Sequence, residues 1–198
     1  NKKNIAIFAS GSGTNAEQIM KRFEGHSGIR VKLIVSNNAS AFVLERARKF
    51  GVKSLVFNRK KLAETEEVDE ALAENKIDFI VLAGFMLLFP ERLVKKYRNR
   101  IVNIHPALLP KYGGKGMYGA RVHEAVKTAG DRETGITIHL VNEQYDEGRI
   151  LFQARCPITE ELSPDDIANC VHKLEHEHYP KVIEDWILKQ VDNWQLDS

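Results

Sequence analysis

Short apolar runs alternate with amphipathic stretches along the first half of the chain. Nearly continuous apolar residues predict four strands covered on both faces: Ile5 to Ala9, Val31 to Val35, Leu55 to Phe57 and Phe79 to Leu82. The stretches between them have the periodicity of helices: Asn15 to Phe23, Ala41 to Phe50 and Leu62 to Ala73. Because strand and helix alternate, we expect right-handed βαβ units and a parallel sheet with helices on both faces.

The second half continues the sheet with a different pattern. Arg100 to Ile104 is typical of another buried strand, whereas Thr134 to Val141 alternates apolar and polar residues, as a strand with two unlike faces does. Ile150 to Ile158 can pair with that strand in antiparallel fashion. We therefore expect an α/β fold: one Rossmann-like domain over residues 1–198, with a mostly parallel sheet and antiparallel carboxyl-terminal strands.

Two further helices are expected in this half. One covers Gly119 to Thr128. The other begins at Ser163, where a serine N-cap, a proline at the next position and an acid at the third helical position favour a helix start. Its apolar residues continue beyond Pro180, where we expect a kink.

The composition is that of an ordinary globular protein, and it narrows the function. Of 198 residues, 43% are hydrophobic and 28% charged, so the chain can bury a core without disulfides. The 29 basic and 27 acidic residues nearly cancel, which gives no bulk attraction to nucleic acid or membrane. Two cysteines exclude a disulfide scaffold and a four-thiolate zinc site. We find no apolar run of about 20 residues and no signal-type leader, so we expect a cytoplasmic protein.

A glycine-rich segment at residues 10–15 (SGSGTN) joins the first predicted strand to the first helix. Glycines let the backbone approach a ligand closely, and the unpaired N–H groups of a helix start attract an anion. The spacing of Gly11, Gly13 and Ala16 also fits the dinucleotide fingerprint, but residues 36–38 (SNN) lack the acid that would bind the ribose. The segment therefore predicts a site for a phosphate monoester, and the alternative is a glycine turn without a ligand.

A second motif, Asn103-Ile104-His105-Pro106, ends a predicted strand. Residues two apart in a strand share a face, so Asn103 and His105 project together. Pro106 stops the strand and puts the pair at the carboxyl edge of the parallel sheet, where open α/β folds bind ligands. An amide and an imidazole aimed at one point can donate hydrogen bonds to a developing oxyanion. A histidine with a structural role alone is the alternative.

Asp146, in the segment Asp146-Glu147-Gly148, is a candidate partner for His105. A carboxylate beside an imidazole favours the imidazolium form and raises its pKa. One histidine can then stabilise negative charge and also pass a proton. The same segment is typical of an ordinary turn, and only the fold can bring Asp146 to His105.

A further pattern, His172-x-x-Glu175-His176, matches the inverted zincin motif of metalloproteases. Such a site needs a third protein ligand, and only Glu177 and His178 lie nearby in the sequence. Short patterns of this kind arise readily by chance in a helix rich in histidine and glutamate. We therefore expect no metal site.

Four segments together resemble the phosphoribosylglycinamide formyltransferases of the folate-dependent formyltransferase family. They are the glycine loop at residues 9–15, Val81 to Met86, Asn103 to Pro110, and Gly135 to Leu140 with residues 146–148. The resemblance covers nearly the whole chain, and the segment N-I-H-P-x-L-L-P is highly specific for the family. It implies that residues 1–100 form a phosphate- and nucleotide-binding half and residues 101–198 a catalytic and folate-binding half.

The resemblance also implies a role for each matching residue. Asn103, His105 and Asp146 match catalytic residues, and Glu175 matches a glutamate that contacts the substrate ribose. The substrate phosphate is expected on Gly11, Ser12, Gly13, Thr14 and Asn15. Folate contacts are implied for Arg59, Met86, Leu87, Leu88, Phe89, Asn103, Asn142, Glu143, Gln144, Tyr145 and Asp146. Arg59 stands here for a basic segment, residues 59–61, whose register stays open.

Three positions depart from the family pattern. Ala107 replaces the usual serine, Leu87 stands where arginine is common, and Lys111 to Ala120 forms a longer loop than in the short members. These differences bear on the pocket and on folate affinity more than on the chemistry.

The implied activity is transfer of the formyl group of 10-formyltetrahydrofolate to the amine of glycinamide ribonucleotide, a step of purine biosynthesis, without a metal. The partners are then two small molecules, with no nucleic acid and no membrane, and the protein is a monomer or a homodimer. Two alternatives stay open. One is another folate-dependent formyltransferase, acting on methionyl-tRNA or an amino sugar, and the other is a nucleotide-binding module without catalytic activity.

Overall fold

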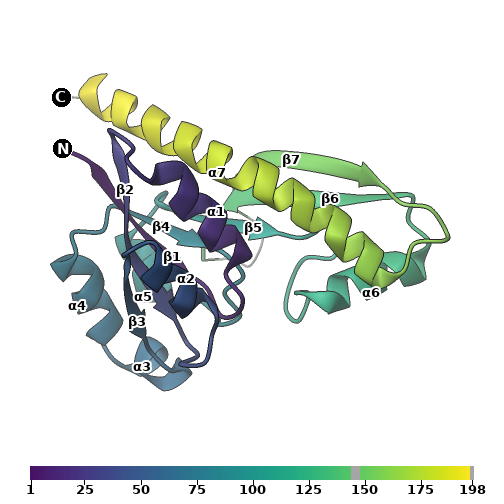
Figure 1. Cartoon of the computed structure of the whole chain (residues 1–198), viewed down its shortest axis with the longest axis horizontal. Coiled ribbons are helices and arrows are strands. Elements are labelled where there is room, and N and C mark those ends of the chain that lie inside the picture. The colour runs from purple at the N-terminus through teal and green to yellow at the C-terminus, as the bar shows by residue number, and fades with distance from the viewer. Residues whose placement is uncertain (144–147, 197–198) are drawn as a thin grey trace.

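The computed structural model describes residues 1–143 and 148–196, with side chains described as far as residue 191. These residues form a seven-stranded sheet in the order β3-β2-β1-β4-β5-β6-β7 (Figure 1). The strands are β1 (Lys3–Phe8), β2 (Ile29–Ser36), β3 (Lys53–Val56), β4 (Phe79–Leu82), β5 (Ile101–His105), β6 (Glu133–Leu140) and β7 (Ile150–Pro157). The pairs among β1 to β5 are parallel, and the β5–β6 and β6–β7 pairs are antiparallel, which confirms the expected fold class.

Helices cover both faces of the sheet, because successive residues of its central strands point to opposite sides. One face packs on α1 (Thr14–Phe23), α2 (Val43–Lys49) and α7 (Pro164–Leu196), the other on α3 (Arg59–Glu64), α4 (Glu67–Glu74) and α5 (Glu91–Lys96). In β1, Ile5 and Ile7 point to the first of these faces, and Ala6 and Phe8 to the second. We call the first the α7 face and the second the α5 face.

The remaining helix, α6 (Ala120–Ala129), supports the loop that follows β5. Val122 and Val126 of α6 form a third apolar cluster with Ile167 of α7 and with Ala107, two residues beyond the end of β5. The loop therefore has its own apolar base, separate from the two main clusters.

The long helix α7 begins as the sequence predicts. Ser163 Oγ accepts a hydrogen bond from the main-chain N–H of Asp166, and Asp166 Oδ2 accepts one from the N–H of Ser163. This reciprocal pair satisfies two N–H groups that the helix start would leave unpaired. α7 passes through Pro180 without a break. None of the helices in the described part of the chain has both the length and the apolar character that crossing a membrane requires.

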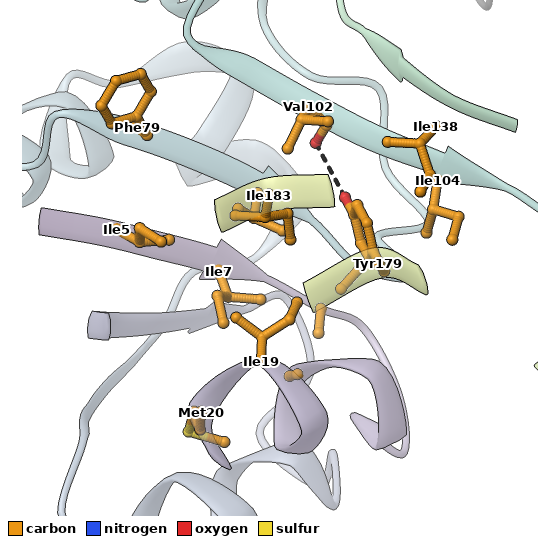
Figure 2. Close-up of a cluster of buried hydrophobic side chains, with 14 of the residues drawn as sticks. Ile5, Ile7, Ile19, Met20, Phe79, Val102, Ile104, Ile138, Tyr179 and Ile183 are labelled. Carbon is orange, nitrogen blue, oxygen red and sulfur yellow. Dashed lines mark hydrogen bonds between the residues drawn. The ribbon is translucent and has the colours of Figure 1, made fainter. Parts of the chain in front are cut away.

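Tyr179 ties α7 to the carboxyl ends of the central strands. Its side chain is fully buried, and its hydroxyl donates to the main-chain oxygens of Leu82 (2.7 Å) and Val102 (3.3 Å). Figure 2 shows this hydroxyl pointing from α7 to the main chain of Val102 among apolar side chains of the α7 face. Because Leu82 ends β4 and Val102 precedes Asn103, the contact fixes α7 against the strand ends that carry the candidate site.

Two elements differ from the expectation. The single helix predicted over Leu62 to Ala73 is divided into α3 and α4. The Thr65 hydroxyl donates a hydrogen bond to the Lys61 carbonyl, and the Arg92 guanidinium donates one to the Thr65 carbonyl. These bonds satisfy the carbonyl groups that a helix end leaves free. The short helix α5, which follows Pro90, was not anticipated, although its acidic first turn and basic last turn are typical of a helix.

Candidate active site

Asn103 and His105 lie side by side on the α5 face of β5, since their neighbours Val102 and Ile104 point to the α7 face. In the sheet, Asn103 pairs with Leu82, the last residue of β4, so His105 extends beyond the end of that strand. The His105 side chain is buried, and Asn103 is half-buried. The two side chains therefore share one face at the carboxyl edge of the parallel strands.

The amide of Asn103 is oriented by a histidine of the neighbouring strand. Its nitrogen Nδ2 lies 3.3 Å from His139 Nε2, and His139 Nδ1 lies 3.0 Å from the main-chain oxygen of Leu140. A carbonyl oxygen only accepts, so His139 Nδ1 carries a hydrogen, and in the neutral ring Nε2 then accepts from the Asn103 amide. The second amide hydrogen of Asn103 is the one that can reach a substrate oxygen.

His105 donates a hydrogen bond to the main chain of the loop that follows it. Its Nε2 lies 2.7 Å from the carbonyl oxygen of Tyr112, so Nε2 carries the hydrogen. Nδ1 is then the ring nitrogen that can serve a substrate or a carboxylate. Asp146, which the sequence predicts beside His105, lies outside the described residues, as do the expected folate contacts Gln144 and Tyr145.

The loop after His105 is held by two polar side chains that sequence reasoning missed. The buried Thr137 hydroxyl of β6 donates to the Ala107 carbonyl (2.7 Å) and accepts from the N–H of Leu109 (3.0 Å). Gln153 of β7 donates to Thr137 Oγ1 (2.9 Å) and to the Leu109 carbonyl (3.2 Å). Only one sequence signal could have indicated Thr137 and Gln153: both are polar residues on β6 and β7, the two strands that follow β5 in the sheet.

The glycine-rich segment forms a tight turn between β1 and α1. Gly13 has a φ of 74°, and a Cβ placed there would lie 2.4 Å from Cγ2 of Val43, so only glycine fits. At Gly11 a Cβ would meet nothing within 4 Å, and its carbonyl accepts from the N–H of Val43. Gly11 and Ser12 are exposed, Thr14 and Asn15 half-buried, and α1 begins directly at Thr14.

Ser10 joins this segment to two other loops at the same edge of the sheet. Its hydroxyl donates to Asn37 Oδ1 (2.6 Å), after β2, and accepts from the main-chain N–H of Met86 (2.8 Å), after β4. Asn37 occupies the region where the dinucleotide fingerprint needs an acid, and its side-chain oxygen is taken by Ser10. The glycine-rich segment and the loop that carries Met86 therefore lie next to each other at the carboxyl edge of the sheet.

Arg46 of α2 supports the same segment. Its Nε donates to the carbonyl oxygen of Ser12 at 2.6 Å, and its Nη1 contacts Glu17 Oε2 at 2.5 Å. The hydrogen bond from Arg46 lowers the pKa of Glu17. Because the contact to Ser12 joins residues 34 positions apart, no local sequence motif indicated Arg46.

Glu175 lies on α7 within a cluster of histidines. It is buried, and its Oε1 accepts a hydrogen bond from His172 Nδ1 at 2.6 Å, which raises the pKa of His172. Burial and the proximity of His172 lower the pKa of the buried His123 on α6. Burial also lowers the pKa of His176. In residues 1–143 and 148–196, no three histidine, cysteine, aspartate or glutamate side chains are grouped to hold a metal ion.

The expected folate contacts divide into core and surface positions. Phe89 is a core residue, since its ring packs edge-to-face on Phe8 at 5.1 Å. Leu87 is partly buried and packs against the apolar cluster of the α5 face, as does Val141. Other expected folate contacts are exposed: Met86, Leu88, Asn142, Glu143 and Arg59. Leu87, after β4, and Val141, after β6, therefore both pack on the α5 face, which also carries Asn103 and His105.

Comparison with known proteins places the chain among formyl transferases. The family model described as "Formyl transferase" matches residues 3–183. The chain is 41% identical to the chloroplastic phosphoribosylglycinamide formyltransferase of Arabidopsis thaliana, over 92% of this chain and 64% of that protein. It is 37% identical to the phosphoribosylglycinamide formyltransferase of Bacillus subtilis (strain 168), over 92% of this chain and 93% of that protein.

The fold agrees with these relatives. The crystal structure of glycinamide ribonucleotide transformylase 1 from Geobacillus kaustophilus matches with a TM-score of 0.84 at 37% identity, over 92% of this chain and 97% of that one. The chain spans less than two thirds of the Arabidopsis protein's length and nearly all of the two bacterial proteins. The family match and these relatives show that the chain belongs to the formyl transferase family.

Proposed function

We propose that this protein transfers the formyl group of 10-formyltetrahydrofolate to the amino group of glycinamide ribonucleotide, a step of purine biosynthesis. The relatives that carry the name phosphoribosylglycinamide formyltransferase support this assignment. In the reaction, a bond forms between the substrate amine and the formyl carbon, and the bond between that carbon and folate N10 breaks. One proton leaves the amine and one is gained by N10, so the atoms balance without another reactant.

The observation that carries the proposal is the pair Asn103 and His105 on one face of β5. Attack by the amine puts negative charge on the formyl oxygen. We infer that the second amide hydrogen of Asn103 donates to this oxygen, because its first is directed to His139. His105 contributes from its Nδ1 side, because its Nε2 donates to the Tyr112 carbonyl. Since the amine is itself the nucleophile, this chemistry requires neither a metal ion nor a covalent intermediate.

Asp146 completes the proposed catalytic set. Its position lies outside the described residues, so its role is carried by the resemblance to the family. A carboxylate there would favour the protonated form of His105 and help remove the proton that the amine loses.

The nucleotide is proposed to lie across the glycine-rich segment and α7. The exposed residues Gly11 and Ser12 and the start of α1 offer main-chain N–H groups to a phosphate, and Arg46, which is paired with Glu17, holds the Ser12 carbonyl in place. Glu175 is proposed to accept from the ribose hydroxyls. The hydrogen bond from His172 keeps its carboxylate oriented.

The folate is proposed to lie between the loop after β4 and the turn after β6. The residues present fit such a ligand, because Met86 and Leu88 expose 47% and 66% of their surface on either side of the partly buried Leu87. A flat, largely apolar ring system can cover these side chains. Arg59, exposed in the first turn of α3, is proposed to contact the charged end of the folate.

A comparison of acceptors tests the proposal. Purified protein is incubated with 10-formyltetrahydrofolate and either glycinamide ribonucleotide, methionyl-tRNA or an amino-sugar nucleotide, and release of tetrahydrofolate is followed by absorbance. We expect turnover with glycinamide ribonucleotide alone. Turnover with another acceptor would identify a different formyltransferase, and binding of the nucleotide without turnover would indicate a non-catalytic module.

A further inference from the structure

We propose that Tyr112, anchored by its hydroxyl to Asp131, is a positioning residue that holds the ring of His105 for catalysis. This inference rests on the role proposed above for His105. Neither Tyr112 nor Asp131 belongs to the residues expected from the sequence to bind either substrate. Their effect on the reaction is exerted through the main chain.

The first observation is the contact between the catalytic ring and the loop. The carbonyl oxygen of the half-buried Tyr112 accepts a hydrogen bond from Nε2 of the buried His105 at 2.7 Å. This contact selects the ring nitrogen that carries the hydrogen and limits rotation of the imidazole. The orientation of His105 therefore depends on where the Tyr112 carbonyl lies.

The second observation is the backbone conformation at Tyr112. Tyr112 adopts a left-handed conformation with a φ of 57°, which L residues with a Cβ disfavour. The residues that follow include four glycines, at positions 113, 114, 116 and 119. Glycine restricts its own backbone least of all residues, so this stretch contributes little to fixing the carbonyl. The Tyr112 ring, which packs against the third apolar cluster, and its hydroxyl are the groups that can anchor it.

The Tyr112 side chain supplies that anchor. Its hydroxyl donates to Asp131 Oδ2 at 2.7 Å, and Lys111 Nζ lies 3.9 Å from Asp131 Oδ1. Burial and the hydrogen bond to Asp131 raise the pKa of Tyr112 to about 12, so the hydroxyl stays a donor at any working pH. A hydrogen bond to a charged acceptor is shorter and stronger than one between neutral groups.

Asp131 itself is well fixed. It follows Gly130, which closes α6 in the left-handed conformation, and its N–H lies 3.4 Å from the Val126 carbonyl. Two residues later β6 begins, the strand whose Thr137 holds the start of the same loop. The segment between His105 and Tyr112 is thus attached at its start to Thr137 of β6 and at its end to Asp131, just before β6. These two contacts hold the loop that positions the His105 ring.

Steady-state kinetics of four variants test the proposal. Tyr112→Phe removes the donor, Asp131→Ala removes the acceptor, and Asp131→Asn keeps an oxygen that can still accept. Tyr118→Phe is the matched control, because Tyr118 lies in the same loop, is 43% exposed and stacks under Arg121. We expect kcat to fall about tenfold or more in Tyr112→Phe and Asp131→Ala, because misplacing a catalytic group costs up to about a hundredfold. The KM values for both substrates should stay within about twofold, as should all parameters of Tyr118→Phe.

Two comparisons separate positioning from a general loss of structure. Asp131→Asn should recover most of the kcat that Asp131→Ala loses, and Tyr112→Phe combined with Asp131→Ala should be no worse than Asp131→Ala alone. If Asp131→Ala fails to fold, the kcat values of Tyr112→Phe and Asp131→Asn still test whether the hydrogen bond positions His105. A kcat within about twofold of wild type in Tyr112→Phe, or an effect on KM alone, would overturn the proposal.

A second readout does not depend on activity. Nitrogen NMR of labelled histidine reports which ring nitrogen of His105 is protonated, with His105→Gln used for assignment. We expect the His105 ring signals to shift in Tyr112→Phe and to stay unchanged in Tyr118→Phe. If wild type transfers no formyl group, the proposed function fails while this measurement still tests the anchor. Unchanged His105 signals in Tyr112→Phe would overturn the anchor itself.

Discussion

Asn103 on β5 and His139 on β6 face each other across an antiparallel pair, with the amide nitrogen of Asn103 3.3 Å from His139 Nε2. The contact makes His139 the group that orients the proposed oxyanion donor. His139 is in turn fixed by the main-chain oxygen of Leu140. The orientation of the amide is therefore set by the neighbouring strand.

Replacing His139 by phenylalanine should slow the reaction without weakening substrate binding. The ring volume is roughly kept, but the acceptor for Asn103 is lost, and one net hydrogen bond is worth about 1 kcal/mol. We expect kcat to fall about fivefold to tenfold with little change in either KM, since 1.4 kcal/mol corresponds to about tenfold. An unchanged kcat would show that Asn103 needs no partner on β6.

Two glycines of the glycine-rich segment should respond differently to the same substitution. Gly13→Ala places a Cβ 2.4 Å from Val43 Cγ2 in a left-handed backbone, and we expect it to destabilise the fold by about 1–3 kcal/mol. Gly11→Ala meets open space and should cost less than about 1 kcal/mol. Unfolding in urea measures both. Equal losses of unfolding free energy in the two variants would contradict the close contact between Gly13 and Val43.

Charge at the start of α1 should discriminate between the two substrates. Thr14→Asp sets a negative charge against the proposed phosphate position, and like charges brought together cost several kcal/mol. The KM for the nucleotide should rise at least about tenfold, while the KM for the folate stays near wild type. Thr14→Asn, of the same size but neutral, is the control. Equal effects of Thr14→Asp on both KM values would place the phosphate elsewhere.

The pair of His172 and Glu175 predicts a pH dependence. The hydrogen bond that His172 donates to Glu175 raises the pKa of His172 in the folded protein, so protonated His172 favours folding. This contribution is complete below the unfolded pKa of about 6.5 and is lost as the pH rises through the raised folded value. Proton NMR titration should show a lower His172 pKa in Glu175→Gln. The same variant should raise the KM for the nucleotide, and an unchanged His172 pKa would contradict the pairing.

Periodicity predicted most of the sheet and placed both proposed catalytic residues on one face of β5. The alternation of a strand is a local property, so it places Asn103 and His105 on one face whatever the rest of the fold does. The boundary errors are also local. Thr65 ends α3 because its hydroxyl takes the Lys61 carbonyl, a competition that apolar periodicity does not record.

The supports of the site could not be predicted in the same way. Arg46 with Ser12, Ser10 with Met86, and Tyr112 with Asp131 are joined by contacts between 19 and 76 positions apart. No motif contains both partners of such a pair, and each partner alone is an ordinary surface or loop residue. These contacts follow from the strand order, which brings separate loops to one edge of the sheet.

The most direct test of the proposed chemistry is the rate of a single turnover at saturating formyl donor and nucleotide in Asn103→Ala and His105→Ala. If these side chains stabilise the charge on the formyl oxygen, each variant should bind both substrates normally and react about 10² to 10³ times more slowly than wild type. A rate within about tenfold of wild type in either variant would contradict the role assigned to that residue.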